Sequence, residues 1–312
     1  MSAARSNRPR SRRYDDADWQ PDHLDHLDEP DRPDPDPDPD PDPQADSDVD
    51  EPRWSTYRDA TKGPQPAPTW VVGDPMAIDD DLGVMKSGKE ADVSLMRRYV
   101  PDPDGAGDGV SCLMAVKRYR SAEHRLFHRD AGYLDGRRVR RSRENRAMAT
   151  RTSFGKELIA HQWANAEFDI LGRLWRAGAS VPYPVQLLGT ELMMEFVGSV
   201  DGVAAPRLAQ LRVDRPTATQ LYGQLVDTLH VLADAGYAHG DLSAYNVLVH
   251  DGRLVVIDLP QAVDVVGNPQ GFDYLRRDCD NICGWFSSSG VWQAEPLELF
   301  DRLSAHVRRV AR

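Results

Sequence analysis

Three oxygen-bearing side chains in the C-terminal half of the chain have the types and spacing for phosphoryl transfer. Asp241 and Asn246 lie five residues apart in the segment HGDLSAYN, and Asp258 ends the apolar segment that follows. Phosphoryl transfer needs little covalent chemistry from a protein but strict placement of charge. One carboxylate must orient the attacking hydroxyl, while an amide and a second carboxylate hold Mg²⁺, which prefers oxygen ligands. The spacing therefore predicts kinase-type phosphotransfer.

A strand, a DG turn and a returning strand over 247–257 would bring Asp258 back to the edge where Asn246 lies. The alternative, that these are turn-capping residues, does not explain why three of them occur in register.

Further candidates lie upstream. Lys117 ends an apolar strand over 112–119, where an ammonium group could meet nucleotide phosphates, and Glu167 lies on the inner face of a predicted helix, from which it could pair with Lys117. The segment MEFV, residues 194–197, would connect two lobes and present backbone groups of Glu195 and Val197 to adenine.

The segment GVMKSGKE, residues 83–90, nearly matches a phosphate-binding P-loop, but Glu90 replaces the required hydroxyl residue. The residues after it alternate like a strand instead of starting a helix. We therefore expect a strand–turn–strand over the phosphates, with Ser87, Gly88 and Lys89 near the nucleotide.

The order of predicted elements is strand-rich and then helix-rich. Hydrophobic periodicity and turn residues predict strands over 82–86, 91–98, 112–119, 182–189 and 191–198, helices over 154–174, 216–235, 271–286 and 294–311, and the hairpin over 246–258.

The net charge of −12 belongs to a tail. Residues 15–51 carry −16 and residues 52–312 only −1. The run PDPDPDPDPDP at 33–43 cannot bury enough surface to offset conformational entropy. We therefore assign residues 1–69 to a disordered acidic tail and linker and residues 70–312 to one domain, with an N-lobe at about 70–195 and a C-lobe at about 199–312.

An arginine-rich insert, Arg118 to Arg151, has eleven arginines against four acids. Three interpretations remain open: a solvated loop, a contact with ribosomal RNA or a ribosomal precursor through phosphates, and an intramolecular contact with the acidic tail. Three scattered cysteines, the lack of a 20-residue apolar run and the lack of a signal peptide favour a cytoplasmic protein.

Several motifs, in order, resemble the RIO family of atypical protein kinases, and its RIO1-like subgroup of the bacterial type in particular, because no winged-helix segment precedes the loop. They are GVMKSGKEADV (83–93), AVKRY (115–119), WANAEF (163–168), MEFVG (194–198), APRL (205–208), HGDLSAYN (239–246), IDLPQAV (257–263) and LRRDC (275–279).

The resemblance implies an α+β, two-lobed protein-kinase-like fold, with a small β-rich N-lobe and a reduced helical C-lobe that has no activation segment. It implies an ATP-dependent protein serine/threonine kinase that uses Mg²⁺ or Mn²⁺, with an unknown protein substrate. It assigns Asp241 as catalytic base, Asn246 and Asp258 as metal ligands, Lys117 to the phosphates, and Asp258 as a candidate aspartyl-phosphate site.

The chain departs from the general kinase pattern at Gly240, where an arginine is usual, and at Leu259 and Pro260, where Phe-Gly is usual. Two alternative functions remain. One is an ATPase switch in small ribosomal subunit maturation, and the other is a small-molecule phosphotransferase of the aminoglycoside-kinase kind.

Overall fold

The computed structural model describes residues 53–88, 90–102, 108–120 and 153–311. The expected disordered tail at 1–52 and most of the arginine-rich insert lie outside these residues. These described residues belong to one compact unit.

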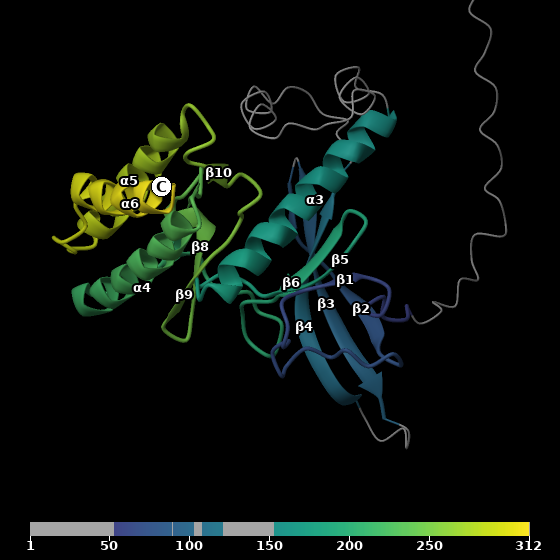
Figure 1. Cartoon of the computed structure of the whole chain (residues 1–312). Coiled ribbons are helices and arrows are strands. Elements are labelled where there is room, and N and C mark those ends of the chain that lie inside the picture. Colours follow the sequence, from purple (N-terminus) through teal and green to yellow (C-terminus); the bar gives the residue numbers. More distant parts are fainter. Residues whose placement is uncertain (1–52, 89, 103–107, 121–152, 312) are drawn as a thin grey trace, which may run out of the picture. The chain divides into compact units, whose positions relative to one another are not determined.

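The N-terminal half of this unit is a six-stranded antiparallel sheet in the order β1-β5-β6-β4-β3-β2 (Figure 1). Its strands are β1 (Thr61–Lys62), β2 (Ile78–Ser87), β3 (Ala91–Pro101), β4 (Asp108–Tyr119), β5 (Pro184–Leu188) and β6 (Glu191–Glu195). In β4 the side chains alternate between the two faces of the sheet. Met114 and Val116 enter one core, whereas Ala115 and Lys117 line a cavity on the opposite face.

The segment between residues 53 and 77 covers one face of this sheet, so the expectation that the linker extends to residue 69 is wrong. Trp54 makes a bridge to Ile78, and β1 pairs with β5. The Tyr183 hydroxyl donates a hydrogen bond of 2.8 Å to the Pro64 carbonyl. The proline-rich composition of the segment hid this role, because its partners in β5 and at Tyr183 lie more than 100 positions away.

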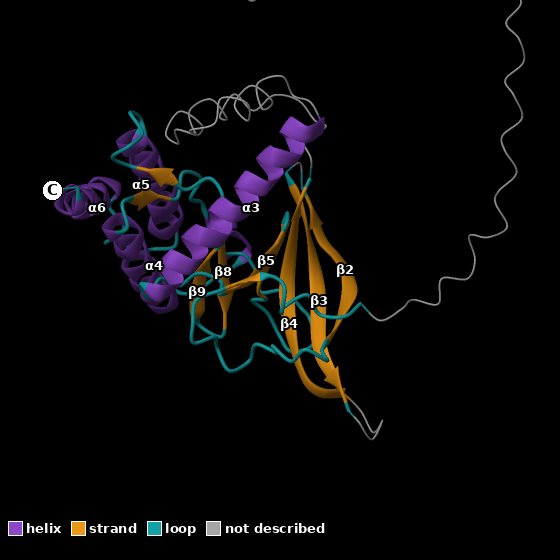
Figure 2. Cartoon of the chain, turned by 45° about the vertical axis from the view of Figure 1, so that its right-hand side comes forward, coloured by secondary structure: helices purple, strands orange, loops and turns teal. Residues whose placement is uncertain are grey.

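The other face of the sheet packs on helix α3 (Ser153–Arg176), which crosses it diagonally (Figure 2). Buried residues of α3, including Ala164, Phe168 and Leu171, belong to a core that continues into the C-terminal half. One helix therefore places its side chains against both the sheet and the helical half.

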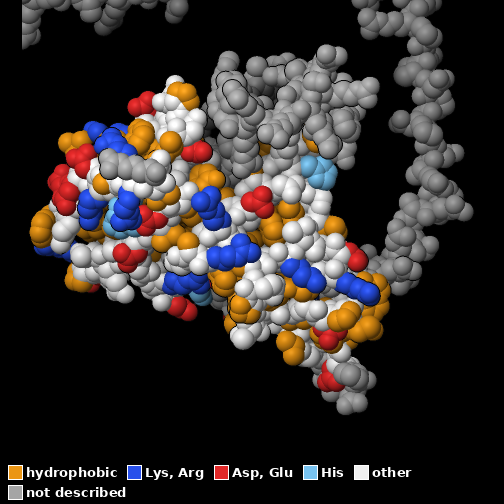
Figure 3. Space-filling model, viewed as in Figure 1, with side chains coloured by type: hydrophobic (Ala, Val, Ile, Leu, Met, Phe, Trp, Pro, Cys, Tyr) orange, Lys and Arg blue, Asp and Glu red, His pale blue; other side chains and the backbone are white. Residues whose placement is uncertain are grey.

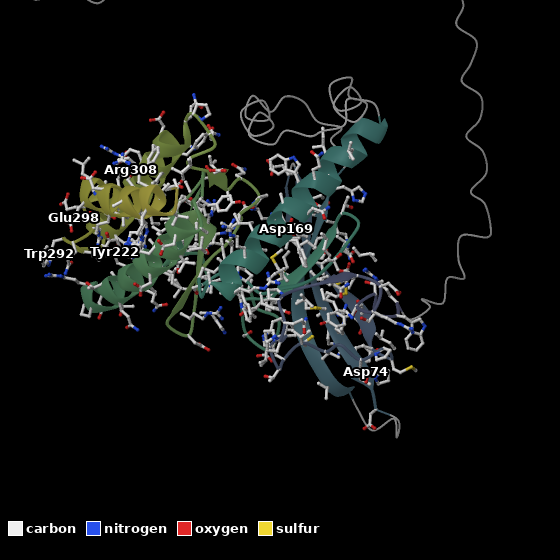
Figure 4. The ribbon with its side chains drawn as sticks, in the orientation of Figure 1. Asp74, Asp169, Tyr222, Trp292, Glu298 and Arg308 are labelled. Carbon is white, nitrogen blue, oxygen red and sulfur yellow. The ribbon has the colours of Figure 1, made fainter. Side chains whose placement is uncertain are left out.

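The C-terminal half contains three α-helices and two short antiparallel strand pairs, β8–β9 and β7–β10. The helices are α4 (Arg215–Asp234), α5 (Gly271–Ser288) and α6 (Pro296–Val310); the strands are β7 (Tyr237–Ala238), β8 (Val247–His250), β9 (Arg253–Val256) and β10 (Val263–Asp264); and the short 3₁₀ helices are η1 (Leu208–Gln210) and η2 (Ala244–Asn246). Tyr222 of α4 packs on Phe286 of α5, with ring centroids 5.2 Å apart (Figure 4). The α+β class is as the sequence predicts, and the predicted strands and helices occur in the expected order, whereas the short strands β1, β7 and β10 were not predicted.

The described surface carries charges of both signs, in keeping with the nearly neutral body. Figure 3 shows Lys and Arg side chains in a loose band across the middle of this face. Among the described residues, no helix combines the length and the hydrophobicity needed to cross a bilayer.

The first two arginines of the predicted insert belong to the sheet. Arg118 binds Asp81 and Glu191, and Arg120 binds Asp92. The insert therefore begins after Arg120, because these two guanidinium groups are already paired with carboxylates of the sheet. The RNA and tail contacts expected of the remaining arginines fall on residues outside those described.

A buried ion pair lies beneath the segment that covers the sheet. Arg98 and Asp79, whose side chains are both fully buried, make a bidentate pair of 2.6 and 2.8 Å, and Gln186 accepts a further hydrogen bond from Arg98. Gln186 in turn donates to Thr56. The pair therefore ties β2, β3, β5 and the covering segment together.

We expect Asp79→Ala to lower the free energy of unfolding by about 3–5 kcal/mol, because it leaves a buried guanidinium without its counter-charge. Urea denaturation measures this change. Asp80→Ala is the matched control, since Asp80 pairs with Arg97 at the partly exposed surface, where an ion pair contributes at most about 1 kcal/mol. Equal losses in the two variants would contradict the assigned role of burial.

Candidate active site

A cavity of about 770 Å³ lies between the sheet and the C-terminal half and collects most of the predicted site residues. Gly88, Lys117 and Glu167 line it from the sheet side and from α3, and Asn246 and Asp258 line it from the C-terminal half. Apolar side chains cover much of the rest of its wall, among them Val93, Ala115, Met194, Val197, Leu248 and Ile257. An apolar slot with a few converging charges suits a flat base attached to phosphates.

Lys117 lies between two carboxylates at this cavity. Its Nζ is 3.0 Å from both Oε1 and Oε2 of Glu167 and 3.1 Å from Oδ1 of Asp258. The Lys117 and Glu167 side chains are 11% and 2% exposed, whereas that of Asp258 is 37% exposed. The structure thus brings together three residues separated by 50 and 141 positions, and the most accessible of them faces the cavity.

The three groups stabilise one another in their charged forms. Burial alone would lower the pKa of Lys117, but Glu167 and Asp258 raise it above its ordinary value. Burial alone would raise the pKa of Asp258, but Lys117, with a smaller contribution from Lys86, holds it below the ordinary value. Both groups are therefore charged at neutral pH.

Asp258 follows the return strand of the β8–β9 hairpin. The Ile257 N–H donates to the Asn246 carbonyl at 3.0 Å, which returns the chain to the loop as the sequence predicts. Asp258 has a φ of +67°, a left-handed conformation that aspartate tolerates better than most residues. These constraints fix where its carboxylate leaves the backbone.

The loop that carries Asp241 is fixed by its own hydrogen bonds. Asn246 Nδ2 donates to the Asp241 carbonyl at 2.9 Å, which leaves the amide oxygen for other partners. His239 is fully buried, its Nε2 lies 3.0 Å from the Ile257 carbonyl, and its Nδ1 accepts from the Asp241 N–H. Because a carbonyl can only accept, the proton of this imidazole is on Nε2. Asp241 does not line the cavity itself but is joined to it through Asn246.

Gly240 explains the departure from the general kinase pattern. Its φ is +85°, and a Cβ atom there would lie 2.5 Å from the Gln261 carbonyl oxygen. A larger side chain, including the arginine usual in kinases, would need a different backbone at this position.

Side chains of helix α5 bind the backbone of the loop around Asp241, and the sequence did not indicate that they belong to the site. Asp278 accepts hydrogen bonds from the N–H groups of Gly240 and Leu242 at 2.8 and 2.9 Å. Arg277 donates to the Gly240 carbonyl at 2.6 Å, and Asn281 donates to that of Leu242. The only sequence signal was the LRRDC motif, because nothing local links α5 to a loop 36 residues earlier.

Burial raises the pKa of Asp278, while the two backbone N–H groups and Arg277 act in the opposite direction. Two backbone donors give this buried carboxylate the partners it requires. The loop is therefore held by a carboxyl group that has almost no contact with water.

The segment expected to meet adenine, residues 194–197, lines the cavity, but Glu195 also connects neighbouring elements through hydrogen bonds. Both Glu195 and Val197 line the cavity. However, the Glu195 N–H already donates to Tyr183, and its carboxylate accepts from the Tyr183 N–H and from Arg253. Glu195 thus ties the sheet to the β8–β9 turn. The carbonyl of Val197 accepts from the Ala205 N–H, so its own N–H is the group that can serve a base.

The predicted phosphate loop is the turn between β2 and β3. Its three predicted nucleotide-binding residues are Ser87, Gly88 and Lys89, of which Ser87 and Gly88 differ in their position relative to the cavity. Gly88 lines the cavity, and its N–H donates to the Ala91 carbonyl. The Ser87 hydroxyl binds Asp92 and Arg120 and does not line the cavity. Lys89 lies outside the described residues. Lys86, one residue before Ser87, also lines the cavity.

The donors at the cavity fit a divalent cation that also binds phosphates. Asn246 and Asp258 offer hard oxygen ligands on one wall, while the described residues hold no cluster of three or more His, Cys, Asp or Glu side chains arranged for a metal. Mg²⁺ typically takes one or two carboxylates and completes its shell with substrate phosphates and water. Two protein ligands are therefore enough for this ion.

Similarity to known proteins agrees with this geometry. The RIO domain model matches residues 106–298. The RIO-type serine/threonine-protein kinase Rio1 of Haloferax volcanii is 37% identical over 215 residues, which cover 69% of this chain and 66% of that protein. The serine/threonine-protein kinase RIO1 of Homo sapiens is 34% identical over 232 residues, which cover 72% of this chain and 36% of that protein. The chain thus spans less than two thirds of the length of these relatives.

Among solved structures, the chain is similar to the Rio2 kinase–ADP/Mg²⁺–phosphoaspartate complex of Chaetomium thermophilum. The TM-score is 0.45 at 19% identity, and the match covers 74% of this chain and 70% of that one. The match of the RIO domain model to more than half of the residues, together with the archaeal relative, shows that this chain belongs to the RIO domain family.

Proposed function

We propose that the chain is an ATP-dependent protein serine/threonine kinase of the RIO type. The convergence of Lys117, Glu167, Asn246 and Asp258 on one apolar-walled cavity carries this proposal. The names of the related proteins from Haloferax volcanii and Homo sapiens support a protein hydroxyl as the acceptor.

In this proposal each side chain has one task. Asp241 accepts the proton of the acceptor hydroxyl, whose oxygen forms a bond to the γ-phosphorus while the bond to the ADP oxygen breaks. Lys117 binds the phosphates, and Glu167 keeps its ammonium in place. Asn246 and Asp258 would hold Mg²⁺ or Mn²⁺, which supplies positive charge to the phosphate oxygens.

Lys117 and Asp258 are paired with each other, so both must exchange partners when nucleotide and cation bind. Lys117 occupies one carboxylate oxygen of Asp258 at 3.1 Å, and a divalent cation would compete for that carboxylate. Nucleotide phosphates offer Lys117 an alternative partner, so we expect nucleotide and cation to bind with positive cooperativity.

We expect Asp241→Asn and Asp258→Asn both to reduce phosphoryl transfer by about 10²–10⁴-fold, since a positioned base or a metal ligand is lost. Nucleotide binding should weaken more in Asp258→Asn, because Asp258 also holds the cation. Transfer of ³²P from ATP, together with titration calorimetry of ATP, measures the two effects.

Asp251→Asn is the matched control, because Asp251 lies at the exposed tip of the β8–β9 turn with a side chain 92% exposed. Its transfer rate should equal that of the wild type. Unchanged transfer in either active-site variant would refute the assigned roles. Acid-labile phosphate retained on Asp258, with none on serine or threonine, would favour the ATPase alternative instead.

The low pKa of Asp258 depends on the positive charge of Lys117, which predicts how the pH dependence of nucleotide binding changes when that charge is removed. Lys117→Met removes the charge that opposes burial, so the pKa of Asp258 should rise. As the solution is acidified, nucleotide affinity in the presence of Mg²⁺ should then fall at a higher pH than in the wild type. An identical pH dependence in the two proteins would contradict the electrostatic account.

A further inference from the structure

A buried tyrosine completes the Lys117–Glu167 pair. Tyr119 follows Lys117 by two residues on β4, so both side chains lie on the same face of the sheet. Its hydroxyl donates a hydrogen bond to Oε2 of Glu167, and Lys117 Nζ lies 5.2 Å from the centre of its ring. Tyr119 is 6% exposed and Glu167 is 2% exposed.

We propose that Tyr119 is a positioning residue for nucleotide binding, which acts by holding Glu167 in the orientation that keeps Lys117 at the phosphates. This inference rests on the proposed kinase function. Tyr119 does not line the cavity, so it reaches the nucleotide only through Glu167 and Lys117.

The need for a second donor follows from burial. A carboxylate at 2% exposure has almost no contact with water, so its oxygens depend on protein donors. Lys117 provides one donor group, but it also binds Asp258. When Lys117 exchanges Asp258 for phosphates, Tyr119 still holds Glu167 in its orientation, because the ring of Tyr119 is packed in the core shared by the sheet and α3.

The surroundings keep this hydroxyl a donor. Burial and the negative charges of Glu167, Asp258 and Glu90 raise the pKa of Tyr119 well above its ordinary value. The phenol therefore stays protonated throughout the range in which the enzyme would work. A phenylalanine would fill the same space but leave one oxygen of Glu167 without this donor.

The test is Tyr119→Phe, with the dissociation constant for ATP in the presence of Mg²⁺ measured by titration calorimetry and kcat measured at saturating ATP. We expect affinity to fall about tenfold, which is the size of a hydrogen bond to a charged group. We expect kcat to change less than about threefold, because Asp241, Asn246 and Asp258 are untouched. A merely structural role would lower the melting temperature without this split.

Tyr183→Phe is the matched control. Tyr183 is also buried and also donates its hydroxyl, but to the Pro64 carbonyl in the core on the opposite face of the sheet. It should lose a similar amount of stability and keep wild-type affinity for ATP. Equal loss of affinity in the two variants, or none in Tyr119→Phe, would overturn the proposal.

A double-mutant cycle isolates the route through Glu167. In the Glu167→Ala background no carboxylate remains to be held, so adding Tyr119→Phe should change the affinity less than twofold. A full tenfold loss in that background would show that Tyr119 acts by another route and would overturn the proposal. If the wild type itself binds no ATP, the proposed function fails, and the positioning role fails with it.

Discussion

The ammonium group of Lys117 makes ion pairs that connect the sheet with helix α3 and with the C-terminal half of the molecule. Its ammonium comes from the central strand β4, Glu167 comes from the helix that packs on the sheet, and Asp258 comes from the far side of the cavity. Like all buried charges, it requires compensation, and each neighbour supplies part of it. The positions of α3 and of the β8–β9 hairpin are therefore linked through one nitrogen atom, and the cavity is formed by the elements that carry its partners.

The C-terminal half contributes a rigid platform. Asp278, Arg277 and Asn281 of α5 bind the backbone on both sides of Asp241, and His239 and Asn246 tie that loop to the hairpin. Because these hydrogen bonds fix the backbone around Asp241, they position its carboxylate without occupying the carboxylate oxygens. A site that acts by placement of charge benefits from such rigidity, because misplacement of a reacting group is costly.

The sheet is stabilised on its other face by a segment whose composition resembles a linker. Residues 53–77 supply Thr56 to the buried Arg98–Asp79 network and Pro64 to Tyr183, and they extend the sheet by one short strand. Polar groups inside a sheet face need such a cover, since a buried ion pair exposed on one side would lose the low-dielectric setting that its geometry requires. The same face also holds apolar residues such as Met96 and Met114, so the segment completes a core as well as a network.

The sequence alone determined the order of the main strands and helices and identified Lys117, Glu167, Asn246 and Asp258 as residues of the site. Local patterns were sufficient for this: β4 alternates, α3 and α4 have helical spacing, and the residues around Asp241, Asn246 and Asp258 form motifs of known spacing. It did not determine that Ser87 turns away from the cavity, that Glu195 ties the sheet to the hairpin, that Asp278 and Tyr119 support the site, or that residues 53–69 pack on the sheet. Those facts depend on partners far apart in the chain, and which hydrogen-bonding groups become buried together is decided only when the sheet, α3 and α5 have packed. A sequence motif indicates the chemistry of which its side chains are capable, whereas tertiary packing decides which hydrogen-bonding or charged partner each side chain contacts.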